Sequence, residues 1–346
     1  MTLPKIDTEG SPIPQADGAV NDYVNKEAAA SDYFDANRTV FFINGMLNSG
    51  KDHAEAALAL SWVQMCKVRG IYNQSVSGWR DFLQCIGDKN QFDGPLSFSA
   101  NNAVGLRTLF AGETSVQAAR EALRRNPAQV STFDELRKPA QRHYEIFAHS
   151  QGNLILSNAL QAILAVDGPK GVAGRVVNTF GSPSVNWPPG IVKYEHGFTF
   201  DPVSWLAGFD STWTISKVGM PANSNNPITH AFLEYLDRDP AFVVNRYRWG
   251  GWGMTFRLDT DALATCLINM GGNFRRVKVI FDYIADAHSF YSDDVALAYV
   301  KLLEKRPALL TMFKRDAALK NLLVGLLDDG WVTGDEKKAI AFLRGL

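Results

Sequence analysis

The sequence contains few cysteines and no excess of either charge, and both absences exclude classes of protein. Its three cysteines, Cys66, Cys85 and Cys266, lie far apart, without C-x-x-C spacing or a nearby pair of histidines. The sequence therefore predicts neither a disulfide framework nor a zinc site. With 35 basic and 36 acidic residues, the net charge gives no electrostatic argument for binding to nucleic acid or to an anionic membrane surface. We expect core thiols and a partner that is not nucleic acid.

Long apolar runs are also missing. No stretch approaches the roughly 18 uninterrupted apolar residues that a membrane-spanning helix needs. The first residues, MTLPKIDTEGSPIPQADGAV, carry acids and prolines where a signal peptide has a basic start and an apolar run. We therefore expect a soluble chain that is cytoplasmic or exported by a leaderless route. A length of 346 residues and an apolar content of 46% are sufficient for a large buried core.

Short buried strands alternate with helices through the middle of the chain. Strands are expected at TVFFIN (39–44), HYEIFA (143–148), RVVNTF (175–180), GFTF (197–200) and TWTISKV (212–218). Helices are expected over 51–68, 79–86, 102–109, 115–125 and 151–166. This alternation is typical of an α/β fold, in which a mainly parallel sheet is covered by helices on both faces.

The chain divides into three predicted parts. Residues 1–37 are rich in Pro, Ala, Asp and Gly, and we interpret them as a mobile N-terminal arm. Residues 38–256 form the α/β domain. Residues 257–346 change to amphipathic helical patterns, clearest over 295–305 and 317–327, and are predicted to form a C-terminal helical region.

The pentapeptide AHSQG (148–152) lies where the predicted strand 143–148 meets the helix 151–166. A serine on so sharp a turn has a strained backbone. It needs very small residues two positions before and after it, because the strand and the helix approach each other there. Ala148 and Gly152 meet that need. We interpret Ser150 as the nucleophile of a nucleophile elbow; its alternative role is the N-cap of the following helix.

A serine hydroxyl becomes a good nucleophile only beside a general base that a carboxylate orients. On an α/β sheet of this kind, the chain order is serine, acid, histidine. Asp201 follows the predicted strand 197–200 directly, at the sheet edge that Ser150 shares, and is the candidate acid. Its alternative role is to cap the loop or helix that follows.

Six histidines are available, and two of them follow Asp201. His53, His143 and His196 are set aside because they are helical, at a strand start or ahead of the acid. His149 is expected to point away from Ser150 and to pack near the strand ends. His230 is preferred as the base because strand, loop, histidine and helix follow in the required order. His288, after a further predicted strand at 277–281, stays the alternative.

An oxyanion hole would complete the catalytic site. The fold builds one from the backbone N–H that follows the nucleophile and from an N–H after an earlier strand. These are the amides of Gln151 and Met46, because Gly45 lets the backbone turn after strand 39–44.

The same loop supports a competing hypothesis. Gly45–Lys51 fits G-x-x-x-x-G-K after a strand, the pattern of a phosphate-binding loop. Asp52 stands where such a loop needs Ser or Thr to hold Mg²⁺, and its carboxylate would repel phosphate. The alternative function is a nucleotide- or phosphate-binding protein whose elbow is not catalytic.

Four motifs, NGM, AHSQG, FDPV and HAFLEYL, together resemble the successive motifs of α/β-hydrolase lipases and esterases over residues 38–236. In bacterial lipases of this type, His-Gly-Met supplies the first oxyanion amide, and Asn44 replaces that histidine here. Some leaderless bacterial effector lipases have a similar layout. The resemblance implies an α/β-hydrolase fold, ester substrates, no cofactor, and a triad of Ser150, Asp201 and a histidine. We expect a serine hydrolase acting on small-molecule or lipid esters, and transient membrane contact stays open.

Overall fold

The computed structural model describes most of the chain. The described residues are 3–74, 115–184, 187–198, 201, 203, 218–219, 230–236, 248–250, 253–255, 260–269, 272–287 and 292–346. The helices predicted at 79–86 and 102–109 lie outside these ranges, as do most of the predicted strand 212–218 and the alternative base His288.

The described strands form a sheet with the order β1-β3-β2-β4-β5-β6-β7. Its members are β1 (Val20–Tyr23), β2 (Asp35–Ile43), β3 (Cys66–Ile71), β4 (Ile146–His149), β5 (Val176–Phe180), β6 (Val192–Phe198) and the two-residue β7 (Val218–Gly219). All neighbouring pairs are parallel except β1 with β3. The predicted α/β class with a mainly parallel sheet is confirmed. A separate hairpin pairs β8 (Arg248–Gly250) with β9 (Gly253–Thr255).

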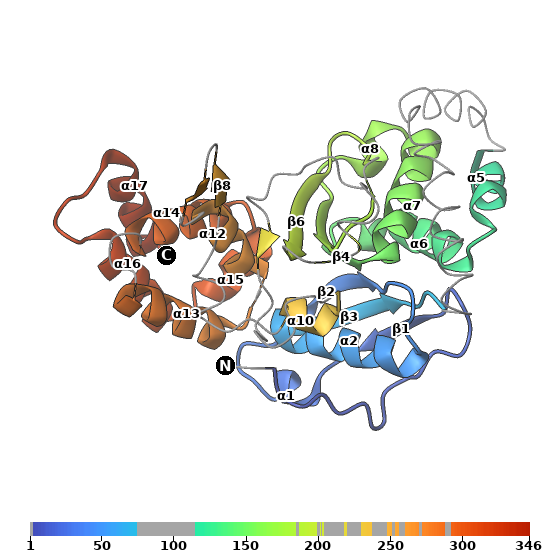
Figure 1. Ribbon diagram of the computed structural model, residues 1–346, viewed down its shortest axis with the longest axis horizontal. Helices are drawn as coiled ribbons and strands as arrows, with labels where there is room; N and C mark the ends of the chain where they lie inside the picture. The colour runs from blue at the N-terminus through green and yellow to red at the C-terminus, as the bar shows by residue number, and fades with distance from the viewer. Residues whose placement is uncertain are drawn as a thin grey trace.

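Both faces of the sheet are apolar, as a parallel sheet covered by helices requires. In β2, Val40 and Phe42 face one core cluster, while Phe41 and Ile43 face the other. The second cluster packs under α5 (Ser115–Leu123), α6 (Pro127–Arg137) and α7 (Gln151–Asp167). The first packs under α2 (Gly50–Gln64) and α10 (Phe232–Leu236), and Figure 1 shows these two groups of helices on opposite sides of the sheet.

The C-terminal helical region is confirmed. It consists of α12 (Thr260–Asn269), α13 (Phe274–Ala287), α14 (Ser292–Glu304), α15 (Pro307–Phe313), α16 (Ala317–Leu327) and α17 (Gly334–Arg344). These helices gather beside the sheet in Figure 1. Their apolar side chains belong to the same core cluster as Phe42 and Trp62, so the region shares one core with the α/β part. None of the described helices has the length and apolar character needed to cross a bilayer.

Short elements complete the described structure. They are α1 (Lys26–Ala29), the 3-10 turn η1 (Pro139–Gln141) and α8 (Pro169–Val172). The expected N-terminal arm is not free of regular structure, because β1 pairs with β3 and α1 follows it. The reason is packing: Tyr23 is 1% exposed, and its ring lies edge-on to His53 of α2, with ring centroids 5.5 Å apart.

Two boundaries differ from the sequence-based expectation. The helix predicted to run to Val68 ends at Gln64, because Met65 adopts a left-handed conformation with φ 49° and Cys66 begins β3. Cys66 and Val68 fit both a helical and an alternating pattern, and pairing with β2 decides between them. The strand predicted at 277–281 lies within α13, where Val277, Ile280, Phe281 and Ile284 are buried at helical spacing.

A buried ion cluster fastens the helical region to the sheet. Arg306, at the start of α15, donates from Nε to Glu145 Oε1 over 3.1 Å and from a terminal nitrogen to Oε2. Arg38, which lies on β2, approaches the same carboxylate at 3.4 Å. Burial opposes a charge on Glu145, but Arg306 and Arg38 outweigh it and hold the pKa of Glu145 below its ordinary value.

Removing this carboxylate would leave two buried guanidinium groups without their partner. We expect Glu145→Ala to lower the free energy of unfolding by about 3–5 kcal/mol, as for other broken buried pairs. The exposed pair Arg344–Asp328 is the matched control, since its side chains are 62% and 49% exposed. Asp328→Ala should change stability by less than about 1 kcal/mol. Urea unfolding of both variants measures the difference, and equal effects would contradict this account.

Candidate functional site

Ser150 occupies a sharp turn between β4 and α7. Its backbone angles are φ 55° and ψ −127°, outside the regions that residues other than glycine prefer. The Ser150 N–H donates to Phe180 O over 2.9 Å, and Asn153 Nδ2 donates to Ser150 O over 3.0 Å. The hydroxyl makes no capping hydrogen bond to α7. The structure therefore lacks the hydrogen bond on which the N-cap alternative depends.

Close packing explains why the residues around this turn are small. A Cβ atom on Gly152 would lie 2.5 Å from Ile43 O, and one on Gly45 would lie 2.4 Å from Ser150 Cβ. Contacts under 3.0 Å force neighbouring atoms to move, and here the obstacle at Gly152 is backbone. Ala148 is fully buried. The end of β2 and the start of α7 thus approach as closely as their backbones allow.

Asp201 and His230 form a hydrogen-bonded pair. Asp201 lies beyond β6 and is fully buried, and its Oδ2 accepts a hydrogen bond from His230 Nδ1 over 2.7 Å. Burial opposes charge on Asp201, but His230, Tyr235 and the N–H of Val203 donate hydrogen bonds to it, and its pKa lies below the ordinary value. In the neutral ring, a proton on Nδ1 that is donated to the carboxylate leaves the lone pair on the other ring nitrogen of His230, Nε2.

Gly181 joins this pair to the Ser150 turn. It directly follows Phe180, whose carbonyl accepts from Ser150, and it has φ 51°. A Cβ on Gly181 would lie 2.6 Å from Asp201 Oδ2 and 2.7 Å from His230 Cε1. Ser150 and the Asp201–His230 pair therefore flank the end of β5.

His149, set aside in the sequence reasoning, contacts the same pair. Its ring centroid lies 4.6 Å from that of His230, and its Nε2 lies 2.7 Å from His230 O. Burial lowers the pKa of His149 to about 3, so the ring is neutral near pH 7 and Nε2–H donates to that carbonyl. His149 thus positions the main chain of His230. Its place beside Ser150 in AHSQG was the only sequence signal for this role.

Tyr235 was not identified from the sequence. Its hydroxyl donates to Asp201 Oδ2 over 2.6 Å, so one carboxylate oxygen accepts from both Tyr235 and His230. Tyr235 is 2% exposed and lies in α10, which begins directly after the His230 segment. Nothing in HAFLEYL distinguishes this tyrosine from a core aromatic residue.

The described residues do not include a bond between Ser150 and His230. His230 Nε2 is buried and makes no hydrogen bond within the described part of the chain. Hydrogen bonds of this kind are often long before substrate binds. Because His288 lies outside the described residues, the choice between the two histidines stays a prediction.

The predicted oxyanion residues are each next in sequence to Ser150 or to a residue that contacts it. Gln151 is the first residue of α7, directly after the turn. Met46 is half-buried in the loop after β2, and the next residue, Leu47, has φ 61° and is 66% exposed. Gly45 lies against Ser150, so this loop borders the serine.

The remainder of the Gly45–Lys51 loop caps α2. Ser49 Oγ accepts from Asp52 N over 3.2 Å, and Asp52 Oδ2 accepts from Ser49 N over 2.8 Å. This reciprocal capping box places a carboxylate at the helix N-terminus, where a bound phosphate would need free N–H groups. The capping geometry therefore works against the phosphate-binding alternative.

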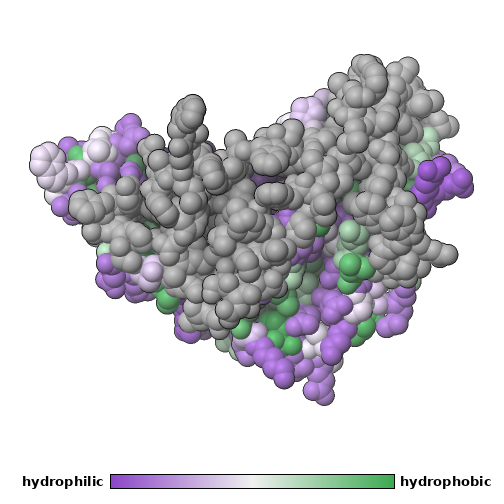
Figure 2. Space-filling view, in the orientation of Figure 1, coloured by the Kyte–Doolittle hydropathy of each residue, from purple (hydrophilic) through white to green (hydrophobic). Residues whose placement is uncertain are grey.

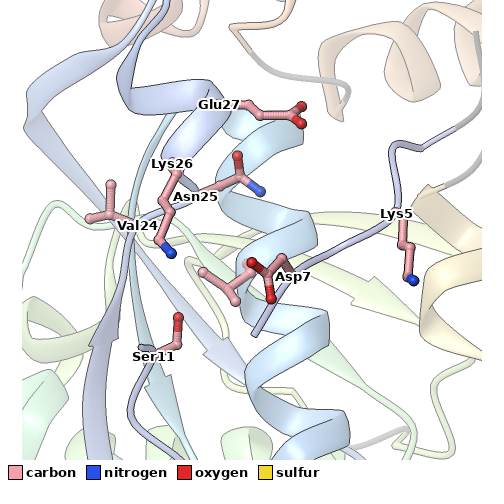
Figure 3. A pocket seen from close by; sticks show the side chains of 8 residues that line it. Lys5, Asp7, Ser11, Val24, Asn25, Lys26 and Glu27 are labelled. Carbon is pink, nitrogen blue, oxygen red and sulfur yellow. The ribbon is translucent and has the colours of Figure 1, made fainter. Parts of the chain in front are cut away.

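A pocket lies between the N-terminal segment and α1, lined by Lys5, Asp7, Asn25 and Lys26 among others (Figure 3). Its polar groups serve local structure, since Asn25 caps α1 and Lys26 donates to Glu9 O. The described residues include no cluster of three potential metal ligands. Figure 2 shows described hydrophilic and apolar side chains interspersed on the face in view.

Gly181 offers a direct test of the close approach at this site. Gly181→Ala introduces both positive-φ strain and a clash with Asp201 and His230. Gly174 is the matched control, because it has φ 74° and a Cβ added there would meet nothing within 4 Å. We expect Gly174→Ala to cost about 1–2 kcal/mol from strain alone and Gly181→Ala to cost more. Unfolding by urea measures the stability, and equal losses would contradict the described packing.

No protein-family model, curated protein or solved structure matches this chain at a significant level. Any function assigned to it therefore rests on the residues themselves and on their geometry.

Proposed function

We propose that this protein is a serine hydrolase of the α/β-hydrolase class that cleaves carboxylic esters. The observation that carries the proposal is the juxtaposition at the end of β5. A serine on a strained strand-to-helix turn lies on one side, and a hydrogen-bonded carboxylate–histidine pair lies on the other. The order Ser150, Asp201, His230 along the chain also matches what such a fold requires.

Each residue has a defined role in the proposed reaction. The Ser150 hydroxyl attacks the ester carbonyl carbon as His230 Nε2 takes its proton. His230 then gives this proton to the leaving alcohol, and an acyl-enzyme remains on Ser150. Water repeats the sequence, with His230 as base, and releases the carboxylic acid. Asp201 holds the ring of His230 in the tautomer that leaves Nε2 unprotonated, and it stabilises the imidazolium form.

The negative charge that develops on the carbonyl oxygen needs donors, which we assign to the N–H groups of Met46 and Gln151. The N-terminus of α7 adds a favourable field at the same place. The reaction requires no cofactor. The proposed substrates are lipid esters or small carboxylic esters, for which the near-neutral chain charge imposes no electrostatic requirement.

His230 is preferred over His288 on geometric grounds. Its Nδ1 is already hydrogen-bonded to a buried carboxylate, and its ring lies against the residue that precedes Ser150. A histidine with a polarised ring and a free lone pair at the correct sheet edge meets the requirements for a general base.

Ser150→Ala should abolish hydrolysis of a nitrophenyl ester, because the mutant lacks the nucleophile. We expect a fall of at least about 10³-fold in kcat/KM, with residual rate from the oxyanion donors alone. A fluorophosphonate probe should label the wild-type protein and not the variant, since only an activated serine reacts. Unchanged circular dichroism serves as the folding control. Substantial turnover by Ser150→Ala would refute the assignment, and ATP-dependent thermal stabilisation without labelling would favour the phosphate-binding alternative.

Comparing the two histidines identifies the base. We expect His230→Ala to lose activity about as completely as Ser150→Ala, because residues that act as one catalytic unit each cause nearly the full loss of rate when removed. His288→Ala should retain activity in the same ester assay. Inactivation of the His288 variant alone would reassign the base.

A further inference from the structure

One peptide group beside Ser150 is held by two asparagine side chains. The carbonyl oxygen of Gly45 accepts from Asn44 Nδ2 over 2.8 Å and from Asn48 Nδ2 over 3.0 Å. Asn48 Nδ2 also donates to Met46 O over 2.9 Å. The loop after β2 thus has its carbonyl groups fixed by side chains rather than by a neighbouring strand.

The held carbonyl belongs to the same peptide as the Met46 N–H. A peptide is planar, and the structure contains no cis bond among its described residues, so the C=O of Gly45 and the N–H of Met46 point in opposite directions. Fixing the oxygen therefore fixes the direction of the N–H. This N–H makes no hydrogen bond within the described part of the chain. Gly45 itself lies against Ser150, since a Cβ atom added to Gly45 would lie only 2.4 Å from Ser150 Cβ.

The orientation of Asn44 is determined by its other partners. Its Oδ1 accepts from the backbone N–H of Asn73 over 2.8 Å and lies 2.8 Å from His53 Nδ1. Its Nδ2 also donates to Asn73 O over 2.9 Å. Because a backbone N–H can only donate, the amide oxygen and nitrogen of Asn44 cannot be exchanged. Burial lowers the pKa of His53 to about 3, so His53 is neutral and donates from Nδ1.

The network reaches the second predicted oxyanion residue. Asn73, in the segment after β3, donates from Nδ2 to Gln151 Oε1 over 2.9 Å. Asn44, Asn73 and Gln151 are all at most 1% exposed. Buried hydrogen bonds in such a network resist exchange with water and hold their members in one geometry. Three sheet-edge segments, after β2, β3 and β4, are thereby joined around Ser150.

We propose that Asn44 and Asn48 are positioning residues that aim the Met46 N–H at the oxyanion by gripping the carbonyl of the Gly45–Met46 peptide. The inference rests on the proposed hydrolase function and deepens it. Neither asparagine touches substrate. Each acts on the peptide group that does, and the direction of a donor at the charged oxygen matters most in the transition state.

Asn48 gives the cleaner test, because it is only partly buried, whereas Asn44 is 1% exposed and has four hydrogen bonds. Asn48→Ala removes one of the two grips. We expect kcat for a nitrophenyl ester to fall about 10-fold to 100-fold, while KM stays within about twofold of the wild-type value. This fall in kcat is smaller than the fall caused by removing a whole oxyanion donor. The inhibition constant of a trifluoromethyl ketone, whose adduct carries the oxyanion, should rise by the same factor.

Asn48→Asp keeps the shape of the side chain but replaces the donor with an acceptor facing two carbonyl oxygens. It should reduce kcat at least as much as Asn48→Ala. If the alanine variant folds poorly, kcat of the aspartate variant still tests the positioning role. Asn37→Ala is the matched control, since Asn37 is an exposed asparagine on β2. It should leave kcat, KM and ketone binding unchanged.

The possible outcomes distinguish a failure of the positioning role from a failure of the proposed hydrolase function. If wild-type protein is labelled by fluorophosphonate and both Asn48 variants keep kcat and ketone affinity, the positioning role is overturned and the hydrolase function stands. A rise in KM with unchanged kcat would also overturn it, because that pattern indicates ground-state binding. If wild-type protein and Ser150→Ala show equal hydrolysis and no labelling, the function itself fails.

Discussion

The backbone of Ser150, with φ 55° and ψ −127°, is the constraint on which the arrangement around it depends. Such a conformation costs a residue other than glycine on the order of 1–3 kcal/mol and persists only where the surroundings enforce it. Here they do so from three sides. Phe180 O accepts the Ser150 N–H, Asn153 holds the Ser150 carbonyl, and the contact of Gly152 with Ile43 O brings α7 against the end of β2. Substitutions that weaken any of these contacts would let the backbone of Ser150 leave this conformation, and the hydroxyl would lose its position at the end of the strand.

The sheet gathers polar groups from distant parts of the chain at one edge. Parallel strands all end at the same edge, so the segments after β2, β3, β4, β5 and β6 lie together there. Two hydrogen-bonded systems meet at this edge. One holds Asp201, His230, Tyr235 and His149; the other joins Asn44 and Asn73 to Gln151. Neither His53 nor His149 carries charge near pH 7, because burial lowers the pKa of each to about 3. The fixed negative charge of Asp201 therefore acts on His230 without competition from a neighbouring imidazolium.

The helical region is joined to the sheet through a shared core and through a buried ion cluster. Its apolar side chains continue the cluster that packs under α2, and Arg306 reaches Glu145, the residue that precedes β4. A buried charge pair gains less from attraction than it loses in hydration unless further hydrogen bonds support it. Arg38 supplies one such contact from β2, and Gln64 in turn accepts from Arg38 at the end of α2. The cluster thus fixes the relative positions of β2, β4 and α15. Because Glu145 directly precedes β4, the start of the strand that leads to Ser150 is held by these ion pairs.

Local patterns in the sequence were sufficient for the α/β class, the C-terminal helices and the strand, turn and helix around Ser150. Period and turn chemistry are properties of neighbouring residues. Chain order favoured Asp201 as the acid and His230 over His288 as its partner, but only the tertiary structure shows the hydrogen bond between Asp201 and His230. What the sequence left open involves contacts between segments far apart in the chain. Cys66 and Val68 fit helix or strand until β2 pairs with them, and Tyr23 looked like part of an arm until it packed against His53. Tyr235 and Asn48 have ordinary positions in the sequence, and the motifs that contain His149 and Asn44 do not reveal their hydrogen-bond partners. These residues acquire roles only where folding turns a hydroxyl, a ring or an amide toward a particular carboxylate or carbonyl, because hydrogen bonding depends on distance and direction in space.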